Sequence, residues 1–359
     1  MTETVFENPY SNLFFDVLAR AKEQGASDIH IQPERDGVQV RFRIHGELVR
    51  GKWIPEPHKT IFLQEAKRLS HCSIGISGRA QDTRFSLSEL ALDVRVNLIP
   101  SLQGEKLVFR LLDQGRNFSM NTLGLLDDAI AAISNALQSS NGVCLITGPT
   151  GSGKTTLLYS ALESLDRSGM NIVTIEDPVE YSFPGITQVQ VSHRLSFADS
   201  LCAILRQDPD VILVGEVRDH ETAELCFQAA ATGHLVLSTL HANNAVEVIR
   251  RLQGLGLSND TVTSCLRFSS AQRLLQKICS HCSEAITDHN IISKNAEGNF
   301  RKRAKGCSRC KNGLTGMVPI LEYMKWEDGD LKKPVQSLKE LAMNRAAMGE
   351  VDTYEALAV

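Results

Sequence analysis

Residues 148–156 read Gly-Pro-Thr-Gly-Ser-Gly-Lys-Thr-Thr and are the strongest candidate for chemistry in this sequence. An apolar run precedes them and a segment of helical spacing follows, which is the context of a phosphate-binding loop. Backbone N–H groups in such a loop surround a polyphosphate, and the helix N-terminus adds positive partial charge. Lys154 is expected to reach the β- and γ-phosphates, and the Thr155 hydroxyl to bind Mg²⁺. The pattern predicts a nucleoside triphosphate site made by Gly148, Pro149, Thr150, Gly151, Ser152, Gly153, Lys154, Thr155 and Thr156.

Two glutamates stand where strand-like segments end. Glu176 follows the run 171–175, and Glu216 follows the run 210–214 after one glycine. In an open parallel α/β sheet, ligands bind just beyond the carboxyl ends of the strands. Phosphoryl transfer uses a carboxylate to position Mg²⁺ and usually another residue to orient the attacking water. We expect Glu216 to order Mg²⁺ or its water shell and Glu176 to orient or activate the water, although the two could exchange these roles.

A third strand-like run, 234–240, carries histidines at both ends. His241 follows its carboxyl end directly after Thr239-Leu240, and His234 opens it. A histidine at the carboxyl end of a strand can contact a γ-phosphate or a neighbouring subunit, whereas a lone histidine is more often a satisfied structural group. His241 is therefore a candidate site residue, and for both histidines the structural alternative stays open.

Two Cys-x-x-Cys pairs, Cys279 with Cys282 and Cys307 with Cys310, are separated by 24 residues. Four thiolates at this spacing suit a tetrahedral zinc ion, with two ligands from each pair. Such a site would have no open coordination position, so we expect it to be structural. A redox pair and disulfide bonds are the alternatives, and disulfides are disfavoured in a reducing compartment.

The composition is that of a globular protein, with 42% hydrophobic and 22% charged residues among 359. The net charge of −4 gives no general attraction to nucleic acid. No apolar run approaches the roughly 20 residues needed to cross a bilayer, and the acidic first residues do not resemble a secretory leader. Five of the nine cysteines stand alone in strand-like or helix-like segments, which favours a reducing compartment. We expect a cytosolic protein with no specific nucleic acid partner.

The chain is long enough for two domains. Residues 1–115 mix helical spacing with alternating strand-like segments and predict a small α+β domain. The polar segment 116–124 is the best candidate for a linker. In residues 125–359, apolar runs alternate with helical stretches, which predicts an α/β domain with a parallel sheet. The cysteine pairs lie in a module at 275–315 within it.

Four motifs together resemble a known family. The phosphate loop, residues 176–181, residues 205–219 and residues 232–243 are similar to the secretion ATPases, and more narrowly to the type II secretion and type IV pilus assembly ATPases. The resemblance implies a PAS-like N-terminal domain and a RecA-like ATPase domain with a zinc module. It further implies an ATP-hydrolysing ring, a hexamer, that uses Mg²⁺ and powers assembly of a pilus or secretion pseudopilus. Its partner would be a platform protein, at the inner face of the cytoplasmic membrane.

The N-terminal region shares this resemblance through Ser-Asp-Ile-His at 27–30 and several strand-like segments. The family's arginines that match Arg95 and Arg110 reach toward the γ-phosphate, so the resemblance implies that role for both. A fixed guanidinium stabilises charge on the transferring phosphoryl group. Simple solvation at the surface is the alternative for these two residues.

Three departures from the family pattern bear on function. Asn244 stands where the family commonly has an acid, and Thr83 stands where it has a glycine, which puts the turn there in doubt. About 25 residues precede the resembling segment, so we expect no additional N-terminal docking domain. Two rival functions remain: a nucleotide-binding ring scaffold without efficient turnover, and a related motor for DNA uptake or pilus retraction. The cysteine pairs speak against retraction.

Overall fold

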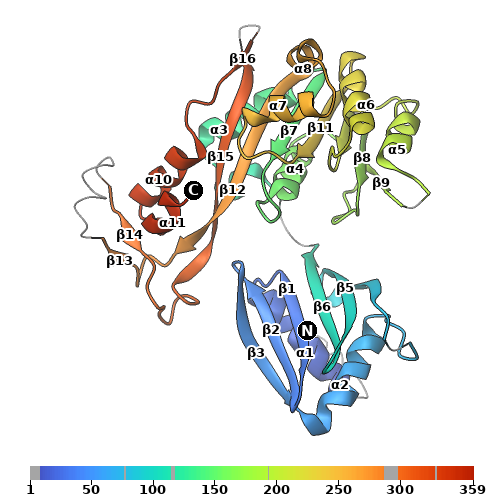
Figure 1. Cartoon of the computed structure of the whole chain (residues 1–359), viewed down its shortest axis with the longest axis vertical. Coiled ribbons are helices and arrows are strands. Elements are labelled where there is room, and N and C mark those ends of the chain that lie inside the picture. Colours follow the sequence, from blue (N-terminus) through green and yellow to red (C-terminus); the bar gives the residue numbers. More distant parts are fainter. Residues whose placement is uncertain (1–8, 77, 115–117, 193, 287–297, 328–329) are drawn as a thin grey trace. The chain divides into compact units, whose positions relative to one another are not determined.

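The computed structural model of the chain describes residues 9–76, 78–114, 118–192, 194–286, 298–327 and 330–359. It divides into two compact units, Met1–Arg116 and Asn117–Val359, coloured from blue to red along the chain in Figure 1. No helix among the described residues is long and apolar enough to cross a membrane.

The N-terminal unit is built on one antiparallel sheet of six strands (Figure 1). In sheet order the strands are β3 (Glu47–Pro55), β2 (Gly37–Ile44), β1 (Asp28–Glu34), β6 (Gly104–Asp113), β5 (Leu92–Ser101) and β4 (Gln81–Leu87). The remaining elements are α1 (Pro9–Glu23), α2 (Glu56–Leu69) and the short 3-10 helix η1 (Ser88–Leu90). Phe14 of α1 packs on Phe62 of α2 and on Phe109 of β6, so both helices cover the apolar face of this sheet.

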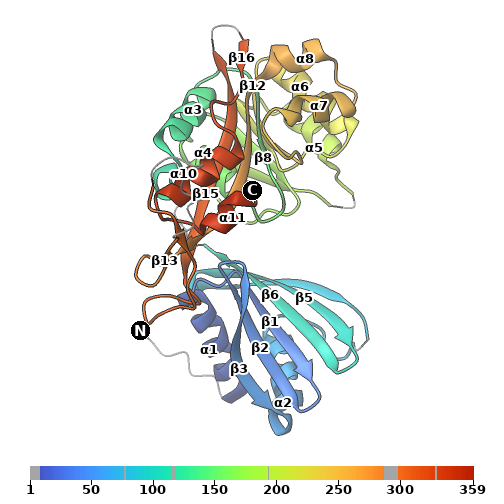
Figure 2. The ribbon, with the colours of Figure 1, turned by 60° about the vertical axis from the view of Figure 1, so that its left-hand side comes forward.

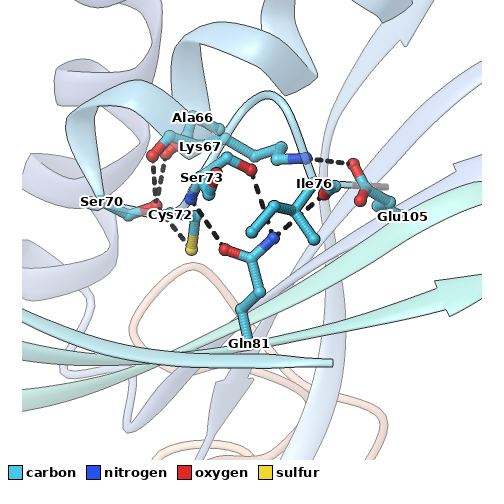
Figure 3. A network of polar contacts seen from close by, with 8 residues as sticks. All are labelled: Ala66, Lys67, Ser70, Cys72, Ser73, Ile76, Gln81 and Glu105. Carbon is cyan, nitrogen blue, oxygen red and sulfur yellow. Dashed lines mark hydrogen bonds and ion pairs between the residues drawn. The ribbon is translucent and has the colours of Figure 1, made fainter. Parts of the chain in front are cut away.

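The connection between α2 and β4 is held by polar contacts, which Figure 3 shows. The side chain of Gln81 accepts a hydrogen bond from the Ser73 N–H at 2.7 Å and donates to the carbonyls of Ser73 and Ile76. The Lys67 ammonium, almost fully buried, pairs with Glu105 at 2.7 Å. The departure noted at Thr83 falls within strand β4, where its hydroxyl donates to the Ser70 carbonyl at 2.7 Å.

The C-terminal unit is built on a mixed sheet of eight strands. In sheet order they are β16 (Asp330–Lys332), β15 (Leu314–Glu327), β12 (Leu266–Ile278), β7 (Gly142–Thr147), β11 (Leu235–Leu240), β10 (Val211–Val214), β8 (Ile172–Glu176) and β9 (Thr187–Gln190). Neighbours from β12 to β9 run parallel, while β15 and β16 pair antiparallel. The parallel sheet expected from the apolar runs is therefore present, and every residue of β7, β8, β10 and β11 is buried.

Helices cover both faces of this sheet, which explains why its central strands are apolar throughout (Figure 2). One face carries α3 (Asp127–Leu137) and α4 (Lys154–Glu163). The other carries α5 (Phe197–Ile204), α6 (His220–Ala231), α7 (Glu247–Gly254) and α8 (Asn259–Cys265). Near the C-terminus, α10 (Leu338–Ala347) packs on β12 and β15 and is followed by α11 (Thr353–Leu357). A small separate sheet pairs β13 (Glu284–Ala285) with β14 (Arg301–Lys302).

Part of the segment expected as linker, residues 116–124, packs into the C-terminal unit. Residues 118–124 contain the 3-10 helix η2 (Met120–Thr122), and Phe118 is buried. The Phe118 ring packs edge-on against Tyr159 and Tyr181. Apolar side chains inside a polar stretch find partners only in the tertiary fold, so these residues extend the core.

Candidate nucleotide site and tetracysteine cluster

The phosphate loop joins β7 to α4, in the order that the sequence predicts. Gly148 has φ 145°, and a Cβ there would lie 2.5 Å from the Gln272 carbonyl oxygen. Gly153 has φ 87°, immediately before α4. Both positions therefore require glycine, for conformation and for space. The Lys154 ammonium donates to the carbonyls of Gly148 and Pro149, at 2.8 and 3.1 Å.

Gln272 of β12 lies under this loop and supports it. Its side-chain amide donates to the Ser152 carbonyl at 2.8 Å. Gln272 and Ser152 are both buried, and the remaining side-chain oxygen of each has no hydrogen-bond partner among the described residues. Buried polar atoms of this kind are uncommon in native proteins and mark a loop whose polar groups are not all satisfied.

Glu216, just beyond the carboxyl end of β10, is held between an imidazole and a guanidinium group. His241 Nε2 lies 3.0 Å from its Oε1, and Arg218 Nη2 lies 2.8 Å from its Oε2. The two strand ends are joined by the Thr239 hydroxyl, which donates to the Gly215 carbonyl at 2.7 Å. The structure thus brings together Glu216 and His241, which the sequence places 25 positions apart.

Glu176 ends β8 in a different environment from Glu216, because it is buried. The Tyr159 hydroxyl, from the helix that follows the phosphate loop, donates to its Oε2. Thr174 and Gln188 donate to its Oε1 at 2.6 and 3.1 Å. Burial, reinforced by the Glu176 carboxylate, raises the pKa of Tyr159, so this hydroxyl stays a donor at neutral pH. Tyr159 therefore ties Glu176 to the phosphate-loop helix.

The charges near Lys154 show which groups lie within electrostatic reach of it. Burial lowers the pKa of Lys154; the Glu216 carboxylate raises it, and the Arg273 charge lowers it further. Glu216 is thus the acid that supports the ammonium form, and Arg273 of β12 is a cation beside the loop that the sequence analysis did not single out.

Two other residues noted in the sequence have local structural roles. The Nδ1 of His234 lies 2.9 Å from the Ala229 carbonyl at the end of α6. The Asn244 side chain accepts the Glu247 N–H at 2.8 Å, at the start of α7. An acid at position 244 could accept the same hydrogen bond, so Asn244 preserves this contact.

Arg95 and Arg110 are direct register partners on β5 and β6 of the N-terminal unit. They belong to a row that crosses five strands and consists, in order, of Arg84, Arg95, Arg110, Asp28 and Arg43. Arg110 Nε donates to Asp28 Oδ1 at 3.2 Å. Arg95 makes no ion pair with a described residue. Because directly paired residues share one face of a sheet, both guanidinium groups belong to the same face.

The four cysteines of the two pairs come together at the end of β12. All four sulfur atoms lie within 4.8 Å of one another. The Sγ–Sγ distances are 3.9 Å for Cys279 with Cys307, and 3.7 Å both for Cys282 with Cys310 and for Cys307 with Cys310. Four thiolates at about 2.3 Å from a tetrahedral zinc ion would lie roughly 3.8 Å apart. The donor set and its spacing are therefore compatible with zinc.

The thiol pKa values show how this cluster could lose its protons. Hydrogen bonds from the backbone at His281 and Cys282 lower the pKa of Cys279 to about 7. Desolvation and the neighbouring thiols raise the pKa of Cys282 to about 12. Interacting thiols titrate together, and a bound cation would favour the thiolate form of all four.

The sequence analysis missed Tyr159, Gln272 and Arg273. Tyr159 is one apolar-looking position on a helix, and nothing local connects it with Glu176. Gln272 and Arg273 stand in β12 among other polar residues, including Ser269, Ser270, Gln276 and Lys277, so the sequence of the strand does not single them out.

The fold and the site define a nucleotide-binding α/β protein with a phosphate loop and a tetracysteine module. The model of the family described as "Type II/IV secretion system protein" matches residues 5–356. The type II secretion system protein HxcR of Pseudomonas aeruginosa is 38% identical over 348 residues, covering 94% of this chain and 71% of that protein. The chain belongs to this family of type II/IV secretion system proteins.

Another relative agrees with this assignment, and solved structures share the fold. The type IV pilus assembly ATPase PilB of Myxococcus xanthus is 39% identical and covers 98% of this chain, which spans 63% of that protein. Among solved structures, the ATPase DotB of Legionella pneumophila aligns with a TM-score of 0.75 at 20% identity, covering 99% of this chain and 96% of DotB. The pilus retraction motor PilT, solved with bound ADP, aligns with a TM-score of 0.64 at 25% identity, covering 96% of this chain and 95% of the PilT chain.

Proposed function

We propose that this chain is the ATP-hydrolysing subunit of a ring motor that powers assembly of a type IV pilus or a type II secretion pseudopilus. The observation that carries the proposal is the phosphate loop with Glu216 and His241 beside it, in a chain of the secretion family. The names of HxcR and PilB point to secretion and pilus assembly. We assign the N-terminal unit as PAS-like and the C-terminal unit as RecA-like.

The reaction is ATP and water to ADP and inorganic phosphate. The water oxygen bonds to the γ-phosphorus, the bond to the bridging oxygen breaks, and a water proton leaves. Lys154 would hold the β- and γ-phosphates, and Glu176 would orient or activate the water. Thr155 and Glu216 offer the hydroxyl and carboxylate oxygens that Mg²⁺ prefers. When bound, Mg²⁺ would neutralise charge on the phosphates, and His241 would keep Glu216 in position.

The working assembly that we propose is a hexameric ring at the inner face of the cytoplasmic membrane. Arg95 and Arg110 would close on the γ-phosphate, and hydrolysis would release them. The resulting rigid-body movement would be passed to a membrane platform protein. The ion pair of Arg110 with Asp28 gives this arginine a defined resting partner.

Arg95→Ala and Arg110→Ala are expected to reduce turnover far more than nucleotide affinity, because a fixed guanidinium mainly meets charge that develops during transfer. Loss of a comparable arginine costs about 10³-fold or more elsewhere. Activity per chain should also rise with protein concentration, as subunits associate. Steady-state ATPase and nucleotide-binding assays, with light scattering over a concentration series, measure both effects.

Arg20→Ala is the matched control, because Arg20 is exposed on α1 and, among the described residues, forms an ion pair with Asp16 alone. Normal hydrolysis by both Arg95→Ala and Arg110→Ala, together with full activity of the wild type as a monomer, would make the ring motor wrong. The nucleotide site would be unaffected by that outcome.

We also propose a structural zinc ion in the module at 275–315, held by Cys279, Cys282, Cys307 and Cys310. Protein purified without added metal should contain one zinc per chain by elemental analysis. Cys282→Ser should lose it and unfold the module, since metal binding contributes folding free energy directly. Cys202→Ser, at an exposed thiol outside the cluster, should keep it. A zinc content near zero, with the four thiols titrating freely, would reject the site.

A further inference from the structure

A cavity rich in arginine opens beside the phosphate loop, and most of its lining residues were not among the site residues that the sequence predicted. The cavity has a volume of about 570 Å³ and is bordered by Gly148 and Pro149 at the start of the loop. The remaining lining comes from the end of β11, from α7 and from β12, and consists of His241, Ala242, Asn243, Glu247, Arg250, Arg251, Gly254 and Arg273. Six of these ten lining residues are polar or charged, so a charged ligand would find partners here.

The charge of this cavity is strongly unbalanced. Three arginines line it, and Glu247 is its single acidic residue. One oxygen of Glu247 already accepts the Asn243 N–H at 2.8 Å. In the described part of the chain, neither Arg250 nor Arg251 has an ion pair with a carboxylate. An anion entering this cavity would meet guanidinium groups that are not already neutralised.

Arg273 is the most buried of the three arginines and lies on β12, the strand beside β7, which leads into the phosphate loop. Its guanidinium donates to two backbone carbonyls, those of Gln272 at 3.1 Å and Asn243 at 2.8 Å. A guanidinium has five N–H donors, so further donors remain for a ligand. Burial lowers the pKa of Arg273, and the Glu322 carboxylate raises it in part.

The position of the cavity indicates which part of a nucleotide it adjoins. Gly148 and Pro149 border it, and their carbonyls accept the Lys154 ammonium. Lys154 is the residue expected at the β- and γ-phosphates, so the cavity lies at the terminal phosphate end of the loop. The nucleoside of the same nucleotide would lie on the side of the loop away from this cavity, beyond the start of α4.

We propose that Arg250 and Arg273 form a phosphate subsite in this cavity, which binds the oxygens of a terminal phosphoryl group. The inference rests on the proposed function, because the loop must hold a nucleoside triphosphate. It adds a specific role: cations of the same subunit hold either the γ-phosphate of bound ATP or the inorganic phosphate released from it. Planar guanidinium groups match phosphate oxygens through paired hydrogen bonds, which are stronger than neutral ones.

The test measures two ligands with the full chain. Inorganic phosphate is titrated into protein loaded with Mg²⁺ and ADP, and a non-hydrolysable ATP analogue is compared with ADP, both by calorimetry. Arg250→Gln and Arg273→Lys should each lower either the affinity for inorganic phosphate or the ratio of the affinities for the analogue and for ADP. The expected decrease is about tenfold or more, which is the scale of a lost charged hydrogen bond. Thermal melting confirms folding. Arg194→Gln, exposed and outside the cavity, is the matched control and should change neither affinity.

Each result has a defined meaning. A loss confined to inorganic phosphate identifies the cleaved product as the ligand, and a loss confined to the analogue identifies the γ-phosphate of bound ATP. If folded Arg250→Gln and Arg273→Lys leave both affinities unchanged, the subsite is overturned, even if subunit association changes instead. If Lys154→Ala then still loses nucleotide binding as expected, the proposed function stands without the subsite. A wild type without affinity for ATP would remove both.

Discussion

Replacing Lys154 with alanine is expected to abolish nucleotide binding, and ATP hydrolysis with it. Its ammonium is the flexible cation at the loop, and it contacts the carbonyls of Gly148 and Pro149. A bound triphosphate would replace these carbonyls as the partner of the Lys154 ammonium, because charged phosphate oxygens are stronger acceptors than carbonyls. Without Lys154, the backbone N–H groups of the loop would face several negative charges with no cation from the loop itself. Calorimetric titration with ATP and a steady-state phosphate-release assay measure the two losses.

Lys305→Ala is a matched control, since Lys305 is an exposed lysine of the same unit that lies outside the phosphate loop. It should bind and hydrolyse ATP as the wild type does. Wild-type affinity in Lys154→Ala would show that the loop does not hold the phosphates, and the functional proposal would fail at its first step.

Glu176→Gln and Glu216→Gln should both retain ATP binding and lose at least about 10²-fold in turnover, the scale of general acid–base or positioning losses. Neither glutamate is expected to supply much of the affinity, because the loop and Lys154 do so. Their losses have different origins, however. Glu216→Gln removes a charge that His241 and Arg218 hold in place, whereas Glu176→Gln alters a buried carboxylate.

A stability measurement separates these origins. In Glu176→Gln, an amide N–H₂ would face Tyr159, Thr174 or Gln188, all of which are donors to the carboxylate. Such a mismatch costs about 1–3 kcal/mol of unfolding free energy, which Glu216→Gln, at a partly exposed site, should not show. Glu224→Gln, at an exposed glutamate of α6, is the control for both assays. Near-wild-type turnover in both site variants would disprove the catalytic roles.

Local sequence patterns were sufficient for the phosphate loop and the cysteine pairs. In each case the chemistry depends on residues a few positions apart. Gly148, Gly153 and Lys154 act through one turn of backbone, and a Cys-x-x-Cys pair brings two sulfur atoms to one side of a turn. The pairing of Glu216 with His241 was also within reach, because parallel strands end at the same edge of a sheet.

The tertiary structure alone decided which residues support and surround these groups. Gln272 lies 120 positions from Ser152, the carbonyl of which it binds, and Tyr159 reaches Glu176 from a helix on another part of the chain. Arg250 and Arg273 line one cavity although they belong to different elements. Side-chain burial and packing set these contacts, and neither is encoded in the spacing of the residues involved. The sequence by itself therefore predicted the candidate site residues, and the fold decided which partners hold them.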